Sequence, residues 1–266
     1  IMNYMEQTFL YPNDFDTTLY ASQLLQAEAI RYGVEHFRRN RGRCMGTVIW
    51  QLNDCWPVAS WASIDYCGRW KALHYYAKRF FAPVMLSCAE EGILTQDTNP
   101  NAEPYEVKKS IHLCVANETM EEQNLTVKWT LRNNRSEILR GGEEAVPAAP
   151  LSSVWLAKQD CMDADTYGDY VSYECFRDGE LISGGCVIFC APKHYRFVDP
   201  KLTVTAEGDV LTVKANAYAR GVEIINEADD MLLEDNYFDM NAGERKIRIL
   251  KGTPEGLKIR SVYNIR

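Results

Sequence analysis

Hydrophobic positions in the first part of the chain recur at helical spacing. Apolar residues return every three or four positions from about residue 16 to residue 39, which predicts an amphipathic helix. A second set with the same spacing spans residues 70–81 and stops before Pro83, because proline cannot continue a helix. Between these helices, residues 47–49 (Thr-Val-Ile) form a short β-branched run that predicts a buried strand.

The pattern changes after residue 86, where short apolar or alternating stretches are separated by turn-forming residues. Such an arrangement predicts β-sandwiches. The predicted turn signals are Asn133-Asn134, Gly141-Gly142, Asp178-Gly179 and Gly184-Gly185, between strands or beside them. The predicted strands cover residues 111–116, 125–131, 170–176, 186–190, 202–206, 210–215, 222–225, 246–250 and 257–262. Glu207-Gly208-Asp209, between two of these strands, is a strong hairpin signal.

Aromatic and hydrogen-bonding side chains follow the predicted buried strand directly. They are Trp50, Gln51, Asn53, Asp54 and Trp56. A pyranose has one apolar face that an aromatic ring can cover and a rim of hydroxyls that amides and carboxylates can bond. This group therefore suits a sugar. The alternative is a core strand that ends in a polar turn, with the tryptophans packed inside.

Three consecutive segments resemble the end of the catalytic barrel in β-mannosidases of glycoside hydrolase family 2. They are residues 50–57 (Trp-Gln-Leu-Asn-Asp-Cys-Trp-Pro), 60–66 (Ser-Trp-Ala-Ser-Ile-Asp-Tyr) and 69–83. The resemblance continues more weakly through the two β-rich regions that follow. It implies a mainly β fold with two immunoglobulin-like β-sandwich domains, preceded by the α/β C-terminal end of a (β/α)8 barrel.

The resemblance gives the three regions of the chain their expected boundaries. Residues 1–86 are expected to be the incomplete barrel end, because a complete barrel of this type needs about 250 residues. Residues 87–196 are expected to form one β-sandwich domain. Residues 197–266 are expected to form a small C-terminal immunoglobulin-like domain, with the connection near residues 197–200.

The resemblance also implies roles for residues of the sugar pocket. Trp50 would lie under the sugar in the −1 subsite, and Trp56 would shape the mouth of the pocket. Asn53 and Asp54 would contact hydroxyls or fix neighbouring side chains. The alternative for Asp54 is a turn residue that bonds its own backbone. His74 is expected to be structural or solvated.

Catalysis by a retaining glycosidase needs two carboxyl groups about 5–5.5 Å apart. In the family that the chain resembles, both are glutamates on earlier barrel strands. The glutamates that precede Trp50 are Glu6, Glu28 and Glu35, and none has a context like that of the catalytic motifs. We therefore predict no catalytic residue in this chain and no turnover by the chain alone. The parent reaction would be hydrolysis of terminal β-mannosides.

Composition and charge exclude several other classes of function. The formal net charge is −8 and there is no long Lys/Arg run, which argues against a nucleic-acid partner. The sequence has no stretch of about 18 apolar residues, so it predicts no membrane-spanning helix. No His/Cys/Asp set has the spacing of a metal site, and the predicted chemistry needs no cofactor.

Cysteine usage bears on the compartment. The nine cysteines include no pair of CxxC motifs, and Cys186 and Cys190 lie too far apart along a strand for an easy disulfide. A reducing compartment fits this usage, so a cytoplasmic location is expected, with a true N-terminus upstream of residue 1.

Barrel helices without their neighbours would expose apolar faces, so a homo-oligomer or a missing N-terminal catalytic portion is expected. One alternative function is a non-catalytic carbohydrate-binding or scaffold protein. Trp129 and Trp155 would then form a binding surface, whereas they are otherwise expected in the sandwich core. Another alternative is a β-galactosidase or β-glucuronidase activity of the same family.

Overall fold

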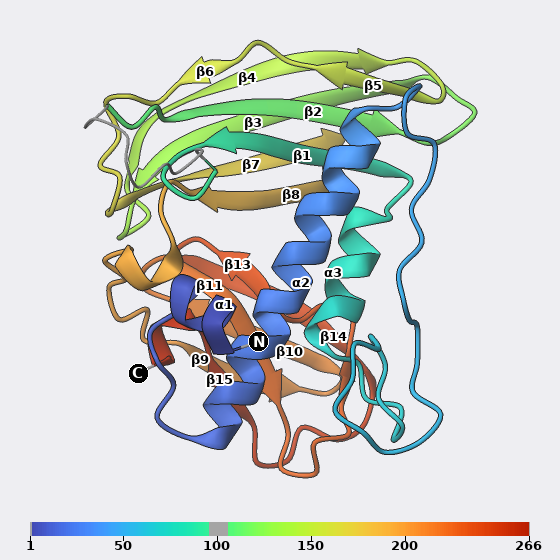
Figure 1. The fold of residues 1–266 in the computed structure, drawn as a ribbon, viewed down its shortest axis with the longest axis vertical. Helices are drawn as coiled ribbons and strands as arrows, with labels where there is room; N and C mark the ends of the chain where they lie inside the picture. The colour runs from blue at the N-terminus through green and yellow to red at the C-terminus, as the bar shows by residue number, and fades with distance from the viewer. Residues whose placement is uncertain (1, 96–105, 266) are drawn as a thin grey trace. The chain divides into compact units, whose positions relative to one another are not determined.

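Both helices predicted from hydrophobic spacing are present. The computed structural model describes residues 2–95 and 106–265 and contains α1 (Met2–Thr8), α2 (Phe15–Arg39) and α3 (Ala72–Phe80). Helix α2 begins after Asp14, whose carboxylate accepts a hydrogen bond from the backbone N–H of Thr17 at 2.8 Å and so caps the helix. Helices α2 and α3 lie side by side (Figure 1).

The chain divides into two units that are not contiguous in sequence. Residues 1–34, 47–80 and 197–266 make up one unit, which we call the helical unit because it holds α3 and most of α2. Residues 35–46 and 81–196 make up the other, which we call the sandwich unit. The first and last regions of the sequence therefore share one unit, whereas sequence patterns treat them as separate regions.

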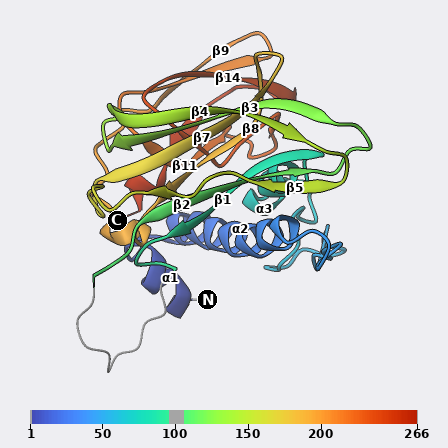
Figure 2. The same cartoon turned by 90° about the horizontal axis from the view of Figure 1, so that it is seen from above.

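The sandwich unit consists of two antiparallel sheets. One pairs β1 (Val84–Glu91) with β2 (Ser110–Asn117), which in turn pairs with β5 (Ser152–Trp155) and β6 (Gln159–Asp160). The other has the order β4-β3-β7-β8, with bounds Ile138–Ala148, Gln123–Asn133, Asp169–Arg177 and Glu180–Ile188. Figure 2 shows β1, β2 and β5 in one layer and β3, β4, β7 and β8 in the other. The buried core between them includes Leu113, Val115, Val127, Val171 and Phe189.

Two glycine pairs of the sandwich unit were predicted as turns but lie inside strands. Gly142 lies in β4 opposite Trp129, and Gly185 lies in β8 opposite Tyr173. A Cβ at Gly142 would lie 2.7 Å from Nε1 of Trp129, and one at Gly185 would lie 2.6 Å from the Tyr173 hydroxyl. Glycine is required there because a large aromatic side chain from the neighbouring strand covers the position.

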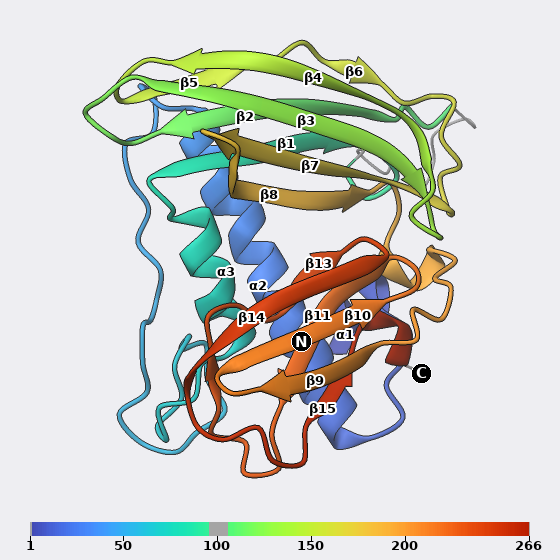
Figure 3. The same cartoon turned by 180° about the vertical axis from the view of Figure 1, so that it is seen from behind.

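The helical unit contains the remaining strands in two sheets. One has the order β12-β14-β10-β9, and the other has the order β13-β11-β15. Figure 3 shows β14, β10 and β9 as neighbours. The predicted hairpin is confirmed, because Glu207 pairs with Val210 across the turn. The bounds are β9 Thr203–Glu207, β10 Val210–Ala215, β11 Ala219–Ile225, β12 Leu232–Leu233, β13 Phe238–Met240, β14 Gly243–Lys251 and β15 Lys258–Arg260. Two short 3₁₀ helices are Pro192–His194, in the sandwich unit, and Val262–Asn264.

Helix α2 packs closely on β11 within the helical unit. The buried Tyr20 hydroxyl donates a hydrogen bond to the backbone oxygen of Gly221 at 2.7 Å. Gly221 has a φ of +63°, and a Cβ there would lie 2.9 Å from a methyl carbon of Leu24. A glycine at this position satisfies both the backbone conformation and the close approach of the helix.

The predicted strand at residues 47–49 is wrong. These residues belong to no ladder among the described residues, and Val48 is 94% exposed. A strand of a parallel barrel takes its hydrogen bonds from a neighbour on each side. Among the residues that the structure describes, no strand pairs with this segment, so its backbone stays irregular.

Candidate functional site

The residues predicted to bind sugar lie in a loop between α2 and α3 that doubles back on itself. We call residues 50–71 the aromatic loop. The backbone oxygen of Leu52 accepts a hydrogen bond from the N–H of Ile64 at 2.8 Å, and the N–H of Asp54 donates to the oxygen of Ile64 at 3.1 Å. The N–H of Lys71 donates to the oxygen of Ser63 at 3.0 Å. The first arm of the loop (residues 50–54) is thereby held against its second arm (residues 60–71), and the second arm is also bonded to itself.

Side chains of α2 attach the aromatic loop to the helices. The Gln26 amide donates a hydrogen bond to the backbone oxygen of Trp61 at 2.8 Å. The side-chain oxygen of Gln23 accepts one from the N–H of Ala72, the first residue of α3, at 3.1 Å. The loop therefore stands on a rigid helical base, which suits a site that must hold a ligand in one orientation.

Three of the four predicted sugar-binding residues face the surface. Trp50 is 71% exposed, Trp56 is 63% exposed, and Asn53 is also exposed. The peptide bond between Trp50 and Gln51 is cis. Trp61 is a third exposed ring of the loop. Our sequence reasoning assigned it no role, although it belongs to the segment that carried the resemblance.

Asp54, the fourth predicted residue, faces inward. It is only 6% exposed, and one carboxylate oxygen accepts a hydrogen bond from the Ser60 hydroxyl at 2.6 Å. The other lies 3.5 Å from Nζ of Lys71. The structure thus places all four residues in one loop but on two sides of it.

The other titratable residues of the loop have structural contacts. Burial raises the pKa of Asp65, but hydrogen bonds from the backbone and side chain of Arg69 outweigh this and lower the pKa overall. His74 of α3 lies with Nδ1 3.2 Å from the Ser63 hydroxyl, and burial lowers the pKa of its imidazole. Its structural role is therefore the simplest interpretation.

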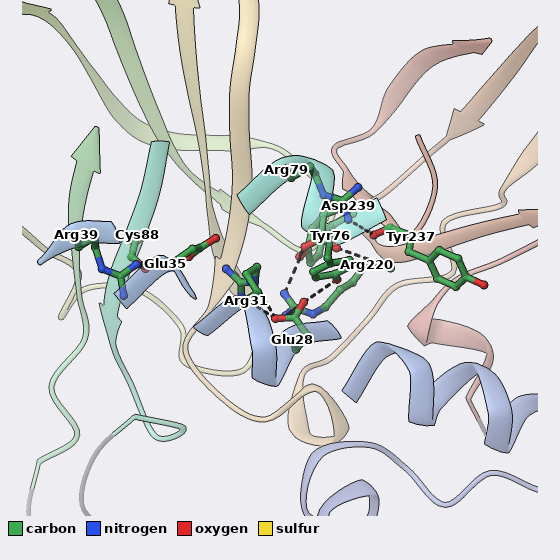
Figure 4. A network of polar contacts seen from close by, with 12 residues as sticks. Glu28, Arg31, Glu35, Arg39, Tyr76, Arg79, Cys88, Arg220, Tyr237 and Asp239 are labelled. Atoms are coloured by element: carbon green, nitrogen blue, oxygen red, sulfur yellow. Dashed lines mark hydrogen bonds and ion pairs between the residues drawn. The ribbon is translucent and has the colours of Figure 1, made fainter. Parts of the chain in front are cut away.

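Glu28, one of the glutamates considered for catalysis, lies in an ion-pair network on α2. Its carboxylate accepts hydrogen bonds from Arg31 at 2.6 Å and from the Tyr76 hydroxyl of α3 at 2.8 Å. Arg220 of β11 lies 3.3 Å away and also contacts Asp239 of β13 at 3.3 Å. Figure 4 shows Arg31, Tyr76 and Arg220 around the Glu28 carboxylate.

The electrostatics of this network oppose a role for Glu28 as a general acid. Burial alone raises the pKa of Glu28, but the Arg31 and Arg220 guanidinium groups outweigh burial and lower it to about 2. A glycosidase acid needs a raised pKa so that it holds a proton at working pH. Glu35, the other helix glutamate, is buried and pairs with Arg39 at 3.5 Å.

The described residues form neither a metal site nor a membrane-spanning helix. Among residues 2–95 and 106–265, no group of three or more His, Cys, Asp or Glu side chains is arranged to hold a metal ion. No helix in this part of the chain is both long enough and apolar enough to cross a membrane. All nine cysteines are free thiols.

Family models match both β regions of the chain, and a sequence relative matches nearly all of it. A domain family described as "Mannosidase Ig/CBM-like domain" matches residues 109–194, and one described as "Ig-fold domain" matches residues 197–265. "Beta-mannosidase B" of Aspergillus terreus is 25% identical over 268 residues, which cover 95% of this chain and 31% of that protein. The chain is homologous to the C-terminal portion of the family 2 β-mannosidases. Its expected mainly β fold with immunoglobulin-like domains is confirmed.

One further sequence relative and two solved structures with the same fold are similar to the chain. Goat (Capra hircus) β-mannosidase is 41% identical over 98 residues, which cover 32% of this chain and 11% of that protein. The solved β-D-mannosidase of Dictyoglomus thermophilum shares the fold, with a TM-score of 0.77 at 22% identity over 97% of this chain and 31% of that one. The exo-chitosanase CsxA of Amycolatopsis orientalis follows, with a TM-score of 0.67 at 14% identity over 97% of this chain and 36% of that one. The chain spans about a third of these longest matches and less of the others.

Proposed function

We propose that this β-mannosidase homologue forms part of a retaining glycoside hydrolase that releases terminal β-mannosides. In this proposal the aromatic loop is part of the wall of the sugar pocket. The observation that carries it is the exposure of Trp50 and Trp56 on a loop that α2 and α3 hold in place. A globular protein rarely leaves several large rings exposed in one segment unless they meet a ligand or a partner.

The exposed side chains supply two kinds of contact that a pyranose needs. The Trp50 ring offers a flat apolar surface for the C–H face of the sugar, and Trp56 offers a second ring at the mouth of the pocket. The Asn53 amide has both donors and acceptors for hydroxyl groups. No group in this set transfers a proton, so the loop binds and orients the sugar while the carboxyl chemistry lies elsewhere.

We further propose that residues 1–86 are the end of the catalytic barrel and that the two catalytic glutamates lie outside this chain. The ion pairs of Glu28 and Glu35 support this, since both carboxylates are already committed to arginine partners. The rest of the sugar pocket would then come from the catalytic portion or from a second copy of the chain, which would cover the exposed rings of the aromatic loop. By itself, the chain is expected to bind a mannoside weakly and not to hydrolyse it.

Hydrolysis of 4-nitrophenyl β-mannoside, β-galactoside and β-glucuronide by the purified chain tests the catalytic part. We expect no turnover of any of the three from a sample that is folded by circular dichroism. Turnover that disappears in Glu35→Gln, or in Glu28→Gln while that variant is still folded by circular dichroism, would contradict the absence of the carboxylates. It would also show which sugar the enzyme accepts, including the two alternatives to mannose.

Titration with methyl β-mannoside, followed by tryptophan fluorescence, tests the pocket wall. We expect Trp50→Ala to abolish the response, while Trp155→Ala, which alters a partly exposed ring of the sandwich unit, leaves it intact. The same pair of variants tests the alternative of a carbohydrate-binding sandwich. That alternative is favoured by one observation, because the Trp155 ring is 40% exposed and lies 4.3 Å from the His112 ring. Loss of binding in Trp155→Ala alone would support it and contradict our proposal.

A further inference from the structure

The inward-facing carboxylate of Asp54 connects the two arms of the aromatic loop. It accepts a hydrogen bond from Ser60 and forms an ion pair with Lys71, the residue before α3. The Ser60 hydroxyl in turn accepts a hydrogen bond from the N–H of Ala62 at 3.0 Å. Nζ of Lys71 also donates to the backbone oxygen of Ser60 at 3.4 Å. We call Asp54, Ser60 and Lys71 the Asp54 cluster.

The burial of the Asp54 cluster separates it from the sugar-facing side of the loop. The Asp54 side chain is almost fully buried. Asn53 and Trp56, which lie on either side of it in the sequence, are exposed. A buried carboxylate is stable only where charges and donors of the protein compensate it. Ser60 donates a hydrogen bond to one oxygen, and the Lys71 ammonium balances the charge from 3.5 Å, while the second oxygen accepts no hydrogen bond among the described residues.

The cluster also lies where it can set the position of the exposed rings. The backbone of Asp54 bonds to Ile64, and Leu52, two residues earlier, bonds to the same residue. Trp50 and Trp56 thus flank a segment that is attached to the opposite arm by both backbone and side chain. A loop released from these contacts would sample many conformations, and ordering it again would cost binding energy.

We propose that Asp54 is a positioning residue of the aromatic loop. Through Ser60 and Lys71 it holds the conformation that presents Trp50 and Trp56, and it does not touch the sugar. The proposal rests on the proposed function of the loop in sugar binding. It differs from direct recognition, in which the carboxylate of Asp54 would bond a sugar hydroxyl.

Variants of the partners distinguish positioning from direct contact. Ser60→Ala keeps the Asp54 carboxylate but removes its hydrogen-bond donor. We expect it to weaken methyl β-mannoside binding about tenfold, the effect of roughly one hydrogen bond. Asp54→Asn should weaken binding at least as much, and the double variant no more than Asp54→Asn alone, since both act through one contact. Lys71→Arg should retain binding better than Lys71→Met.

One binding result would overturn the proposal. If Ser60→Ala and Lys71→Met bind the sugar as tightly as the wild type while Asp54→Asn does not bind, the carboxylate contacts the sugar directly. Ser60→Ala is the decisive variant, because it removes one hydroxyl and leaves the charges of the loop in place.

A measurement without sugar keeps the inference separate from the proposed function. The indole N–H signals of Trp50 and Trp56 in ¹H–¹⁵N spectra should move in Ser60→Ala, while the signal of Trp129 in the sandwich unit stays. Unchanged signals for all three rings would overturn the positioning role. If the signals move but the wild type shows no response to any mannoside, the proposed function fails and the positioning role stands.

Discussion

Replacing Glu28 by glutamine is the sharpest test of how the helical unit is held together. The carboxylate links Arg31 of α2, Tyr76 of α3 and Arg220 of β11. Glutamine keeps the size and one acceptor oxygen but removes the charge. Arg31 then loses the charge of Glu28, while Arg220 keeps its ion pair with Asp239. Removing one partner of a buried ion pair is among the costlier single changes in a protein, because it leaves the other charge uncompensated.

The magnitude follows from the pKa of Glu28. It lies at about 2, against an ordinary value of 4.5, because the arginines outweigh the cost of burial. A difference of about 2.5 pKa units corresponds to about 3 kcal/mol of folding free energy at neutral pH. We therefore expect Glu28→Gln to lower the free energy of unfolding by about 3 kcal/mol at pH 7, at the lower end of the range for a broken buried ion pair, because the Glu28 side chain is 18% exposed.

The pH dependence provides a second, independent check. Because the folded-state pKa of Glu28 is depressed, its contribution is complete above the unfolded-state pKa of about 4.5 and is lost as the pH falls toward 2. The difference between wild type and Glu28→Gln should therefore shrink by about 1 kcal/mol between pH 7 and pH 4. It should shrink further at lower pH.

Urea unfolding of both proteins, followed by circular dichroism at pH 7, 5 and 4, measures this difference. Glu244→Gln is the matched control, since Glu244 pairs with Lys214 at 3.1 Å on the exposed surface of the same unit. Exposed pairs of this kind contribute about 0–1 kcal/mol. A Glu28→Gln cost no larger than the control, or one that stays constant from pH 7 to pH 4, would refute the electrostatic reasoning.

Local geometry gives three further predictions, two for substitutions and one for cysteine reactivity. Gly142→Ala should lower the stability of the sandwich unit by about 1–3 kcal/mol, because the new methyl group would meet the Trp129 ring, and an unchanged thermal midpoint would contradict this. Gly33→Ala in α2 meets nothing within 4 Å, so it should stabilise by about 0.5–1 kcal/mol in the same melting experiment. Cys55 is exposed and should react with a thiol reagent in the folded protein. The buried Cys114, whose pKa burial raises to about 12, should react only after denaturation, and equal rates would argue against this fold.

The candidate site could be predicted only in part. Trp50, Asn53 and Trp56 were predicted from residue type and resemblance, and the structure leaves all three exposed in one loop. The inward orientation of Asp54 was not predictable, because it depends on Ser60 and Lys71, six and seventeen positions further along the chain. A carboxylate next to an exposed amide has the same local sequence signal whichever way it points.

Elements that depend on local spacing were determined by the sequence itself. The periodicity of residues 16–39 predicted α2, and the glycine at 208 predicted the hairpin of β9 and β10, since both features depend on neighbours a few residues away. Contacts between distant residues were decided only by the tertiary structure. Local pattern does not reveal that an aromatic ring covers Gly142, or that Arg220 reaches Glu28. It also predicted a strand at residues 47–49, where hydrogen bonds from neighbouring strands, and not β-branched side chains, decide whether a strand forms.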